Sequence, residues 1–404
     1  MRSALEPDDD ADRRIRAVAA AYPRRVPRTG LDAVERLAAA AGAAPPPHST
    51  VVVGTNGKTS TATYLARWLR RAGLACGLTI SPHILRWGER VVVDGVPADD
   101  AELAVRIERL HALARGLELT AEVRFFDLVT LAAAELFAEA GVEYGVFEAG
   151  IGGRLDAARI LDAELVVLTG VGLDHQDLLG ETEVEILREK LGVAPAGATV
   201  VSAPLAPQLA EAAEAFAAAH ALRLRFAAAP GGGLLAANAE LARRAALLLG
   251  VAAPAGSLAE IVARPVAGRL QRLDAGGVEV LLDAAHNAQA WSAVASALPE
   301  RFVCVVSASA DRDPAALAPA LRGAAAVVAT EAWADRSRPA AALAAALGGE
   351  TVDVVEDPAG AVRRGLDLAR ARSLPLVVLG SAYLLPHAFR ALGLEPLGID
   401  RGGS

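Results

Sequence analysis

The segment from Val51 to Leu69, VVVGTNGKTSTATYLARWL, constrains the fold more than any other part of the chain. It begins with Val51–Val53, three β-branched residues without alternation, which is the pattern of a buried parallel strand. Two glycines, Gly54 and Gly57, then bracket a tight turn, and apolar residues at helical spacing follow. The pattern therefore predicts a strand, a glycine turn and a helix in direct succession.

A strand, a glycine turn and a helix N-terminus in this order form a phosphate-binding site. Free backbone N–H groups and the positive end of the helix dipole both point at the anion. Lys58 is expected to reach the β- and γ-phosphates, and the Thr59 hydroxyl is expected to bind Mg²⁺. Gly54 and Gly57 are closer together than in the general P-loop motif, so an ordinary turn with a surface lysine is the alternative. The complete order of elements favours nucleotide binding.

Composition narrows the class of protein. A chain of 404 residues that is 53% hydrophobic can fill two or three domains. The net charge of −8 without a basic block argues against nucleic acid as a partner. No apolar run is long enough to span a bilayer, and the N-terminus lacks the basic-then-apolar order of a signal peptide. Cys76 and Cys304 lie far apart in apolar runs and are expected to be buried thiols. The expected protein is a cytoplasmic monomer that binds small molecules, with no membrane partner.

Lysine is nearly absent from this chain. Lys and Arg together number 40, yet lysine occurs only at Lys58 and Lys190. The abundance of Ala, Gly and Arg is typical of a GC-rich genome, which replaces lysine wherever arginine will serve. A lysine that survives then marks a position where a guanidinium cannot substitute. Lys190 is therefore a candidate for lysine-specific chemistry, and the alternative is chance survival of one surface lysine.

Alternating strand and helix patterns predict parallel sheets with helices on both faces. A stretch with prolines and a glycine, residues 251–265, separates two such series. We therefore predict an α/β protein with a P-loop parallel-sheet ATPase domain, residues 1–264 including an N-terminal helical arm, and a smaller Rossmann-like α/β domain, residues 265–404. After the P-loop, strands are expected at residues 75–80, 91–93, 144–147, 165–168, 199–202, 278–282, 302–306, 325–329, 351–355 and 376–379.

Polar residues stand at the carboxyl ends of several expected strands, which is where open α/β sheets bind ligands. These residues are Ser81, Glu148, His175 and Asp283. A carboxylate directly after an apolar strand, as at Glu148, is costly unless it holds a cation, and oxygen ligands suit Mg²⁺. Taken singly, His175 could be a hydrogen-bonded turn residue and Glu148 a solvated strand end. Beside a P-loop, the two together favour a metal site.

Eight motifs occur in the order and with roughly the spacing of one known family. They are GTNGKTS, SPHILRWGERV, FFD, EAGIGGRLDA, LDHQDLLG, REKLG, GRLQ and LDAAHN. The chain thus resembles the folylpolyglutamate synthase/dihydrofolate synthase family of the Mur ligase superfamily, from about residue 20 to 390. All Mur ligases share the first motif, whereas Ser-Pro-His, Gly-Gly-Arg-Leu-Asp and Leu-Asp-His are more specific to the folate branch.

The resemblance implies a role for each matching residue. ATP binding is implied for Gly54, Asn56, Gly57, Lys58, Thr59, Ser60, Asn238, Arg269 and Asp283. A site for two Mg²⁺ ions is implied for Thr59, Ser81, Glu148, His175 and Lys190, with Lys190 carbamylated. The pterin or folate side is implied for Phe125, Phe126, Asp127, Leu155 and Asp156. The resemblance also places His286 near the amino-acid end of the site, and implies that the catalytic residues are Lys58, Lys190, Arg269 and His286.

The chain departs from the family pattern at a few positions. Asp-Ala-Thr-Asn is replaced by Asp156–Arg159, Phe-Phe-Glu ends in Asp127, His-Gln is replaced by Leu234-Leu235, and His-Asn-Pro ends in Ala288. These changes spare the phosphate and metal chemistry and fall mainly on the folate pocket.

The implied reaction is ATP-dependent joining of L-glutamate to a pteroate or folate carboxylate through an acyl phosphate. One alternative is another Mur-type amide ligase acting on a cell-wall precursor, and the SPHIL and GGRLD runs count against it. The other alternative is a nucleotide-binding protein that has lost ligation. Retention of Lys190 and His286 counts against that alternative.

Overall fold

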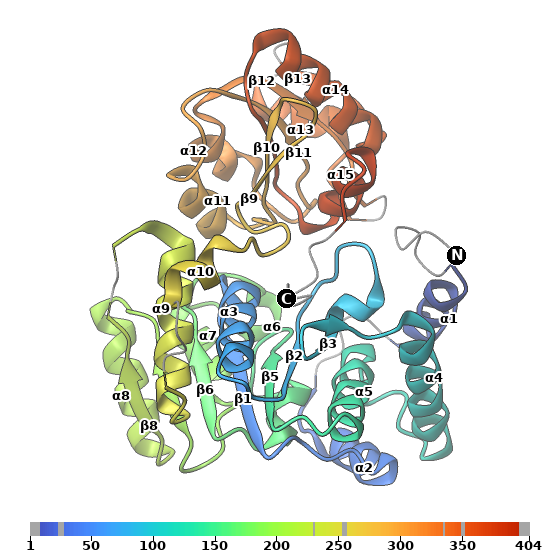
Figure 1. Cartoon of the computed structure of the whole chain (residues 1–404), viewed down its shortest axis with the longest axis vertical. Helices are drawn as coiled ribbons and strands as arrows, with labels where there is room; N and C mark the ends of the chain where they lie inside the picture. Colours follow the sequence, from blue (N-terminus) through green and yellow to red (C-terminus); the bar gives the residue numbers. More distant parts are fainter. Residues whose placement is uncertain are drawn as a thin grey trace. The chain divides into compact units, whose positions relative to one another are not determined.

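The computed structural model describes residues 9–22, 28–228, 231–252, 257–333, 336–348 and 352–395. These residues fall into two compact units, and the division lies between Arg264 and Pro265 (Figure 1). Unit 1 precedes this boundary and unit 2 follows it. None of the helices in the described ranges has both the length and the hydropathy needed to cross a membrane.

Unit 1 is built on an eight-stranded sheet in the order β4-β3-β2-β5-β1-β6-β7-β8. Neighbouring strands from β2 to β8 run parallel, as the alternating pattern predicts. The strands are β1 (His48–Val53), β2 (Cys76–Thr79), β3 (Val91–Val93), β4 (Val96–Pro97), β5 (Tyr144–Glu148), β6 (Leu165–Leu168), β7 (Thr199–Ser202) and β8 (Arg223–Phe226).

One edge of this sheet is antiparallel, which the alternation did not predict. β3 pairs antiparallel with β2, and β4 pairs antiparallel with β3. The reason for the second pair is the two-residue turn at Asp94 and Gly95, which joins β3 to β4 and in which both residues have a positive φ. Such turns match the twist of two adjacent antiparallel strands. Strand β8, on the opposite edge, was also missed, because its short RLRF sequence follows a long helix pattern.

The helices of unit 1 cover both faces of the sheet, and α3 is buried on nearly all sides. Tyr64, Leu65, Trp68 and Leu69, predicted as its apolar positions, are all buried. α3 packs beside α9 (Figure 1). The helices are α1 (Asp9–Ala20), α2 (Asp32–Ala41), α3 (Lys58–Arg71), α4 (Asp100–Gly116), α5 (Phe125–Glu139), α6 (Gln176–Leu179), α7 (Glu183–Leu191), α8 (Pro207–Ala219), α9 (Gly233–Leu248) and α10 (Ser257–Ala263), with 3-10 turns η1 (Trp87–Arg90) and η2 (Ala157–Leu161).

Unit 2 has a six-stranded sheet in the order β13-β12-β11-β14-β10-β9. Five of its strands were expected and begin within one residue of the predicted positions, although Thr351 lies outside the described residues. β9, which pairs antiparallel with β10, was not expected. The strands are β9 (Gln271–Asp274), β10 (Glu279–Leu282), β11 (Phe302–Val306), β12 (Ala324–Ala329), β13 (Val352–Val354) and β14 (Leu376–Leu379).

The antiparallel pair in unit 2 has the same cause as the one in unit 1. Gly276 and Gly277 both adopt a positive φ, so the chain turns back tightly between β9 and β10. Helices pack against this sheet, and Trp291 of α11 is fully buried among them. They are α11 (Ala288–Ala295), α12 (Ala318–Leu321), α13 (Ala340–Leu347), α14 (Pro358–Arg372) and α15 (Leu385–Ala391), with 3-10 turns η3 (Pro314–Leu317) and η5 (Ala382–Leu384).

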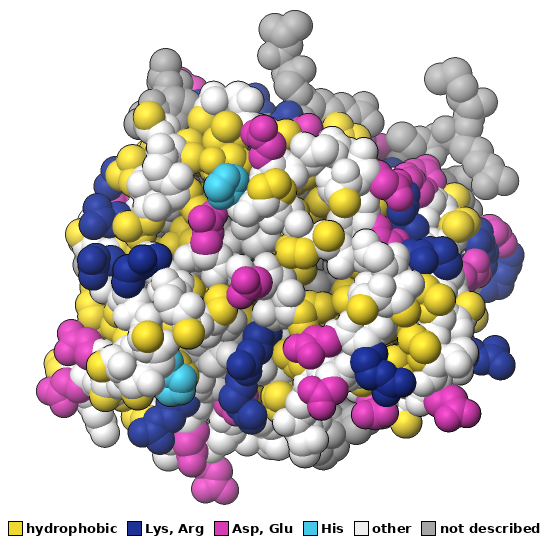
Figure 2. Space-filling view, turned by 90° about the horizontal axis from the view of Figure 1, so that it is seen from below, with side chains coloured by type: hydrophobic (Ala, Val, Ile, Leu, Met, Phe, Trp, Pro, Cys, Tyr) yellow, Lys and Arg dark blue, Asp and Glu magenta, His cyan; other side chains and the backbone are white. Residues whose placement is uncertain are grey.

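The cysteines and the surface charges agree with the composition. Cys76 in β2 and Cys304 in β11 are buried free thiols, as expected. On the face of the molecule drawn in Figure 2, basic and acidic side chains are interspersed around apolar ones. That face offers no stripe of positive charge of the kind that binds nucleic acid.

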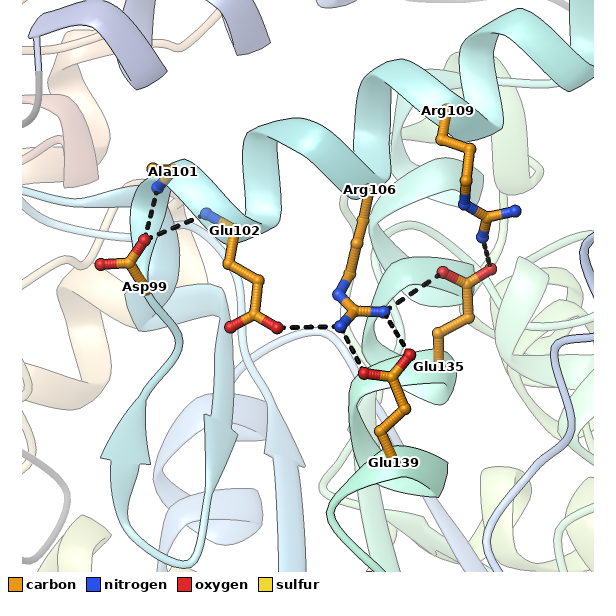
Figure 3. A network of polar contacts seen from close by, with 7 residues as sticks. All are labelled: Asp99, Ala101, Glu102, Arg106, Arg109, Glu135 and Glu139. Atoms are coloured by element: carbon orange, nitrogen blue, oxygen red, sulfur yellow. Dashed lines mark hydrogen bonds and ion pairs between the residues drawn. The ribbon is translucent and has the colours of Figure 1, made fainter.

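A network of charged side chains joins α4 to α5 (Figure 3). Arg106 donates to Glu102 at 2.8 Å on its own helix and to Glu139 at 2.8 Å on α5. The buried carboxylate of Glu135 lies between Arg106 and Arg109 and pairs with both. Arg106 is therefore the side chain that balances two carboxylates of α5 at once, and its hydrogen bond to Glu139 raises the pKa of the guanidinium.

Replacing Arg106 by Ala should lower the free energy of unfolding by about 1–3 kcal/mol, because it leaves the buried Glu135 carboxylate poorly balanced. Urea denaturation measures this change. Arg16→Ala is the control: it removes an i,i+4 pair with Asp12 in which the arginine is largely exposed, and should change stability by less than about 1 kcal/mol. Equal effects of the two substitutions would mean that the network in Figure 3 adds nothing beyond an ordinary surface pair.

Candidate active site

Four neighbouring strands of unit 1 bring the predicted residues to one edge of the sheet. In the order β2-β5-β1-β6, Ser81 follows β2, Glu148 ends β5, the P-loop follows β1 and His175 follows β6. Residues from positions 54 to 175 therefore converge because their strands are adjacent and parallel.

The P-loop is held in place by the loop that follows β6. Gly54 has a φ of +151°, and a Cβ on it would lie 2.0 Å from the Thr169 hydroxyl, so only glycine fits. Thr169 Oγ1 donates to the carbonyl of Asn56 at 2.6 Å, and Thr55 Oγ1 donates to that of Gly172 at 3.0 Å. These contacts fix the curvature of the loop before any ligand binds.

Three residues around the start of α3 occupy the predicted phosphate-binding positions. Gly57 precedes the helix with a φ of +85°, so its turn is one that glycine adopts without strain. Lys58 Nζ donates to the carbonyl oxygens of Gly54 at 2.9 Å and Thr55 at 3.2 Å, which holds the ammonium against the loop. Ser60 follows in the first turn of α3 and is buried.

Glu148 links three of the predicted elements. Its side chain is 96% buried, since only 4% of the residue is exposed. Oε1 accepts from the Thr59 hydroxyl at 3.1 Å, and Oε2 accepts from the backbone N–H of Ser81 at 3.0 Å. A buried carboxylate beside two hydroxyl-bearing residues is a donor set that suits Mg²⁺, so the residues fit the predicted metal.

His175 occupies a strained turn next to a buried acid. Its φ of +49° is unusual for a residue with a side chain, and its backbone N–H donates to Asp174 Oδ1 at 2.9 Å. Among the residues that the structure describes, no group of three His, Cys, Asp or Glu side chains is close enough to hold a metal. The predicted donor set contains only two residues of these types, because Thr59, Ser81 and an unmodified Lys190 are not among them.

Lys190 is not a surface lysine. It lies at the end of α7 and is 3% exposed, so the alternative of chance survival on the surface is wrong. Burial, reinforced by the charge of Lys58, lowers the pKa of Lys190 to about 7, while Asp174 acts in the opposite direction. A large part of this lysine is therefore neutral near pH 7.

The EAGIGGRLDA motif packs against the turn that carries Lys190. A Cβ on Gly153 would lie 2.5 Å from the carbonyl oxygen of Lys190, so glycine is required for this approach. Arg154 N donates to the carbonyl of Glu189 at 2.8 Å. The EAGIGGRLDA and REKLG motifs are far apart in sequence but pack directly against each other in the fold.

Asn238 of α9 lies against the P-loop. A Cβ on Gly57 would come within 2.7 Å of Asn238 Oδ1, which puts the amide at the start of α3. Asn238 thus lies beside the P-loop although Leu234 and Leu235 stand where the family has His-Gln. Packing of α9 along α3 explains this, because helix contacts set the position of the amide.

The residues predicted for the pterin or folate side come together around two buried carboxylates. Asp156 accepts from the N–H groups of Gly150 and Ala158, both at 2.9 Å, and burial raises its pKa to about 6. Asp127 accepts from Arg124 N at 2.6 Å and so closes the N-terminus of α5. Phe125 packs edge-on against Trp87, with ring centroids 5.6 Å apart, and Phe126 approaches Gly150.

Arg28 belongs to this group and was missed by sequence reasoning. It pairs with Asp127, and both side chains are at most 5% exposed. Its Nη1 also donates to the carbonyl of Leu155 at 3.3 Å. A separation of 99 residues from Asp127 leaves no local pattern in the sequence that could have revealed the pair.

A second group of predicted residues lies in unit 2, at the end of β10. Asp283 is buried and accepts from Leu270 N at 2.7 Å and Ala285 N at 2.8 Å. Burial raises its pKa, whereas the Arg269 charge acts against this. Asp283 thus fixes the turn that carries Arg269, a role the sequence did not suggest.

His286 is oriented by the same strand end. Its Nδ1 lies 3.0 Å from the carbonyl oxygen of Ala284, so Nδ1 carries the proton of that hydrogen bond, which fixes the orientation of the ring. Asn287 caps α11 by accepting from Ala290 N at 2.8 Å. The LDAAHN motif is therefore a strand end, a histidine and a helix cap in succession.

The buried pair of Arg28 and Asp127 gives a test of this arrangement. Arg28→Met should lower the free energy of unfolding by about 3–5 kcal/mol, because it leaves a buried carboxylate without its cation. Combining it with Asp127→Asn should recover part of that loss, and urea denaturation of the single and double variants measures the coupling. Arg14→Met, which breaks a less buried pair with Glu108, is the control and should cost less. Strictly additive effects of Arg28→Met and Asp127→Asn would contradict a direct interaction.

Two family models match the chain, one in each unit. The Mur ligase middle domain matches residues 52–193, which span the P-loop, Glu148, His175 and Lys190. The Mur ligase, glutamate ligase domain matches residues 268–381, which span Arg269, Asp283 and His286.

Curated relatives carry names from folate metabolism. A protein of Halobacterium salinarum named "Probable bifunctional folylpolyglutamate synthase/dihydropteroate synthase" is 34% identical over 83% of this chain and 46% of its own length. The "Dihydrofolate synthase/folylpolyglutamate synthase" of Bacillus subtilis is 35% identical over 39% of this chain and 37% of its own length. The chain thus spans less than half the length of these relatives in the matched regions.

Solved structures match over nearly the whole chain. Mycobacterium tuberculosis folylpolyglutamate synthase, complexed with ADP and AMPPCP, has a TM-score of 0.84 at 25% identity and covers 96% of this chain and 100% of that one. The bifunctional folylpolyglutamate synthase/dihydrofolate synthase of Yersinia pestis, complexed with AMPPNP and Mn, has a TM-score of 0.83 at 26% identity, over 95% and 98%. With both domain models, the motif order and these structures in agreement, the chain belongs to the Mur ligase superfamily and is similar to its folylpolyglutamate synthase/dihydrofolate synthase branch.

Proposed function

We propose that this protein is an ATP-dependent ligase that joins L-glutamate to the carboxylate of a pteroate or folate. The observation that carries the proposal is the buried Lys190, whose charge interacts with that of the P-loop residue Lys58. A lysine that is partly neutral beside a phosphate site can accept carbon dioxide and become a carbamate. The relatives' names and their complexes with ADP, AMPPNP and Mn support the nucleotide, the divalent metal and the substrate class.

The unit 1 residues would bind and align the nucleotide and the metal. The P-loop N–H groups and Lys58 would hold the phosphates, with Asn238 beside them. Thr59, Ser81, Glu148, His175 and a carbamylated Lys190 would hold two divalent cations, and Mg²⁺ would supply neutralisation of the phosphate charge. Because the pKa of Lys190 is about 7, forming the carbamate requires little energy to remove its proton.

The acceptor would lie between the buried carboxylates of the FFD and RLDA motifs. Phe125 and Phe126 offer aromatic faces for a planar pterin, and Asp127 and Asp156 offer carboxylates whose positions are fixed by backbone N–H groups. The acceptor carboxylate would attack the γ-phosphorus, giving an acyl phosphate and ADP. The amine of L-glutamate would then attack the acyl carbon, and phosphate would leave.

The unit 2 residues would act on the transferring phosphoryl group and on the amino acid. Arg269 would place its charge on the developing phosphoryl centre, and Asp283 holds its turn. His286, whose ring is oriented by the hydrogen bond of Nδ1 to the carbonyl of Ala284, would act at the amino-acid end of the site. Positioning and charge neutralisation would provide most of the rate enhancement.

An ADP-release assay tests the function directly. The purified protein is supplied with ATP, Mg²⁺ and L-glutamate, and the acceptor is varied among dihydropteroate, a tetrahydrofolate and a UDP-linked cell-wall precursor. We expect ADP release only with a pterin acceptor, together with a product heavier by one glutamyl residue. Release with the cell-wall precursor alone would support the other class of Mur ligase, and binding of ATP without any turnover would support a non-catalytic protein.

Glu148→Gln and His175→Ala should each abolish ligation while the fold is retained, because both remove a proposed metal ligand. Glu148→Gln keeps the size of the side chain and can still accept from Ser81 N, so it isolates the charge. Initial rates at increasing Mg²⁺, with circular dichroism as the check on folding, measure the effect. Near-normal rates for both variants at saturating Mg²⁺ would remove these residues from the metal site.

Lys190→Arg should be inactive although it keeps the positive charge, because a guanidinium cannot form this carbamate. Lys190→Ala should be equally inactive but partly rescued by short carboxylates, which fit the space left beside the metal. Carbon-13 NMR after equilibration with labelled bicarbonate should show a carbamate signal in the wild type and none in either variant. An active Lys190→Arg enzyme would refute this role.

A further inference from the structure

Arg67 is a buried cation in the phosphate-binding helix that plays no part in the proposed chemistry. It lies on α3, nine residues after Lys58, and is 3% exposed. Burying a guanidinium is costly unless it is hydrogen-bonded, and burial lowers the pKa of Arg67 to about 10, so that it stays charged at neutral pH. Its guanidinium also lies 5.9 Å from the ring centroid of Tyr64.

Two hydrogen bonds of Arg67 reach the end of α10, next to the boundary between the units. Nη1 donates to the carbonyl oxygen of Arg264 at 2.7 Å and to that of Ile261 at 3.3 Å. Carbonyl groups at the end of a helix lack partners within the helix and carry partial negative charge, so a cation is favourable there. Arg67 thus ties the end of α10 to the helix that begins at the P-loop.

The segment that follows this contact is short and stiff. Pro265 restricts the backbone both at its own position and at Arg264. Arg269 N then donates to the carbonyl of Val266 at 3.0 Å, which closes residues 266–269 into a turn. The next residue, Leu270, is held by Asp283 at 2.7 Å. One proline is therefore all that separates the anchored Arg264 from the turn that presents Arg269.

The lengths of the intervening segments show how the contact between Arg67 and Arg264 restricts the position of Arg269. Along α3, Arg67 is about 14 Å from Lys58 at 1.5 Å per residue. The chain from Arg264 to Arg269 takes five residue-to-residue steps and spans at most about 17 Å even when fully extended. Fixing Arg264 on α3 therefore limits how far Arg269 can lie from that end of α3, whereas a free end of α10 would enlarge the volume open to Arg269 and lower its effective concentration at any one point.

We propose that Arg67 is a positioning residue that couples the phosphate-binding helix to Arg269 through the anchored end of α10. The inference rests on the proposed function, since it assumes that Arg269 acts on the transferring phosphoryl group. In this proposal Arg67 acts through Arg264 and does not itself contact substrate or nucleotide.

Three variants test the coupling. Arg67→Met removes the hydrogen bonds but keeps an unbranched apolar side chain. Arg67→Lys keeps the positive charge but loses the planar guanidinium, which can donate to two carbonyl oxygens at once. An insertion of Gly-Gly between Arg264 and Pro265 leaves Arg67 intact and frees the turn. Arg71→Met is the matched control, because Arg71 joins the same two helices through a partly exposed ion pair with Glu260.

Arg67→Met and the insertion should each lower kcat about tenfold or more, while the KM for ATP and the affinity for a non-hydrolysable ATP analogue stay near wild-type values. Arg67→Lys should fall between them and the wild type, and Arg71→Met should stay within about twofold of wild type. Hydrogen exchange should be faster at amides 261–269 in Arg67→Met and unchanged in Arg71→Met. A general loss of packing would instead affect all steady-state parameters together.

A wild-type kcat in folded Arg67→Met, or in the insertion variant, would overturn the proposal. So would unchanged exchange at amides 261–269 in Arg67→Met, which is measured without any turnover. Failure of the proposed function has a different signature, because the wild-type protein itself would then release no ADP. If Arg67→Met does not fold, the insertion variant and Arg67→Lys still decide the question.

Discussion

The buried carboxylate of Glu148 is the interaction on which the arrangement of unit 1 depends. It ends β5 and accepts from Thr59 at the start of α3 and from Ser81 after β2. A single side chain therefore joins the loops that follow three adjacent strands. Such a group is costly to bury, and its two hydrogen bonds offset that cost while leaving a negative charge beside the phosphate site. The same residue thus organises the loops and, in the proposed function, would also hold a cation.

Strand-end carboxylates recur as organising groups in both units. Asp156 joins the loop after β5 to η2, and Asp283 joins the end of β10 to the turn that carries Arg269. In both cases burial raises the pKa and backbone N–H groups counteract the effect. The loops are therefore fixed by fully satisfied acceptors, which gives the site a rigid frame before substrates arrive. Asp127 follows the same principle at the N-terminus of α5, with Arg28 as an added cation.

Buried or partly buried cations also have specific contacts in unit 1. Lys58 is held by carbonyl oxygens of its own loop, and Lys190 is buried close enough for the two charges to interact. Arg67 extends the influence of α3 to the boundary of unit 1. α3 therefore begins at the P-loop and, through Arg67, also holds the end of α10. This is a physical reason for a buried arginine where an apolar residue would be cheaper to bury.

The sequence by itself determined the P-loop, most of the strands of both sheets and the strand ends at which the site lies. These features follow from local patterns: β-branched runs, glycine turns and helical periodicity. Even the special status of Lys190 could be inferred from composition, because lysine is nearly absent elsewhere. The antiparallel edges formed by β3, β4 and β9 were not anticipated, since a tight turn can reverse a strand without changing its alternation pattern.

Only the tertiary structure decided which distant groups meet. Arg28 and Asp127 are 99 residues apart, and Arg67 lies 197 residues from Arg264. Neither pair leaves a periodic or local signal, because a hydrogen bond between remote segments depends on strand order and helix packing. The burial of Lys190 and the contact of Asn238 with Gly57 were settled in the same way. Local sequence patterns determine which helices and strands form, whereas burial and long-range contacts arise only when those elements pack together in the folded chain.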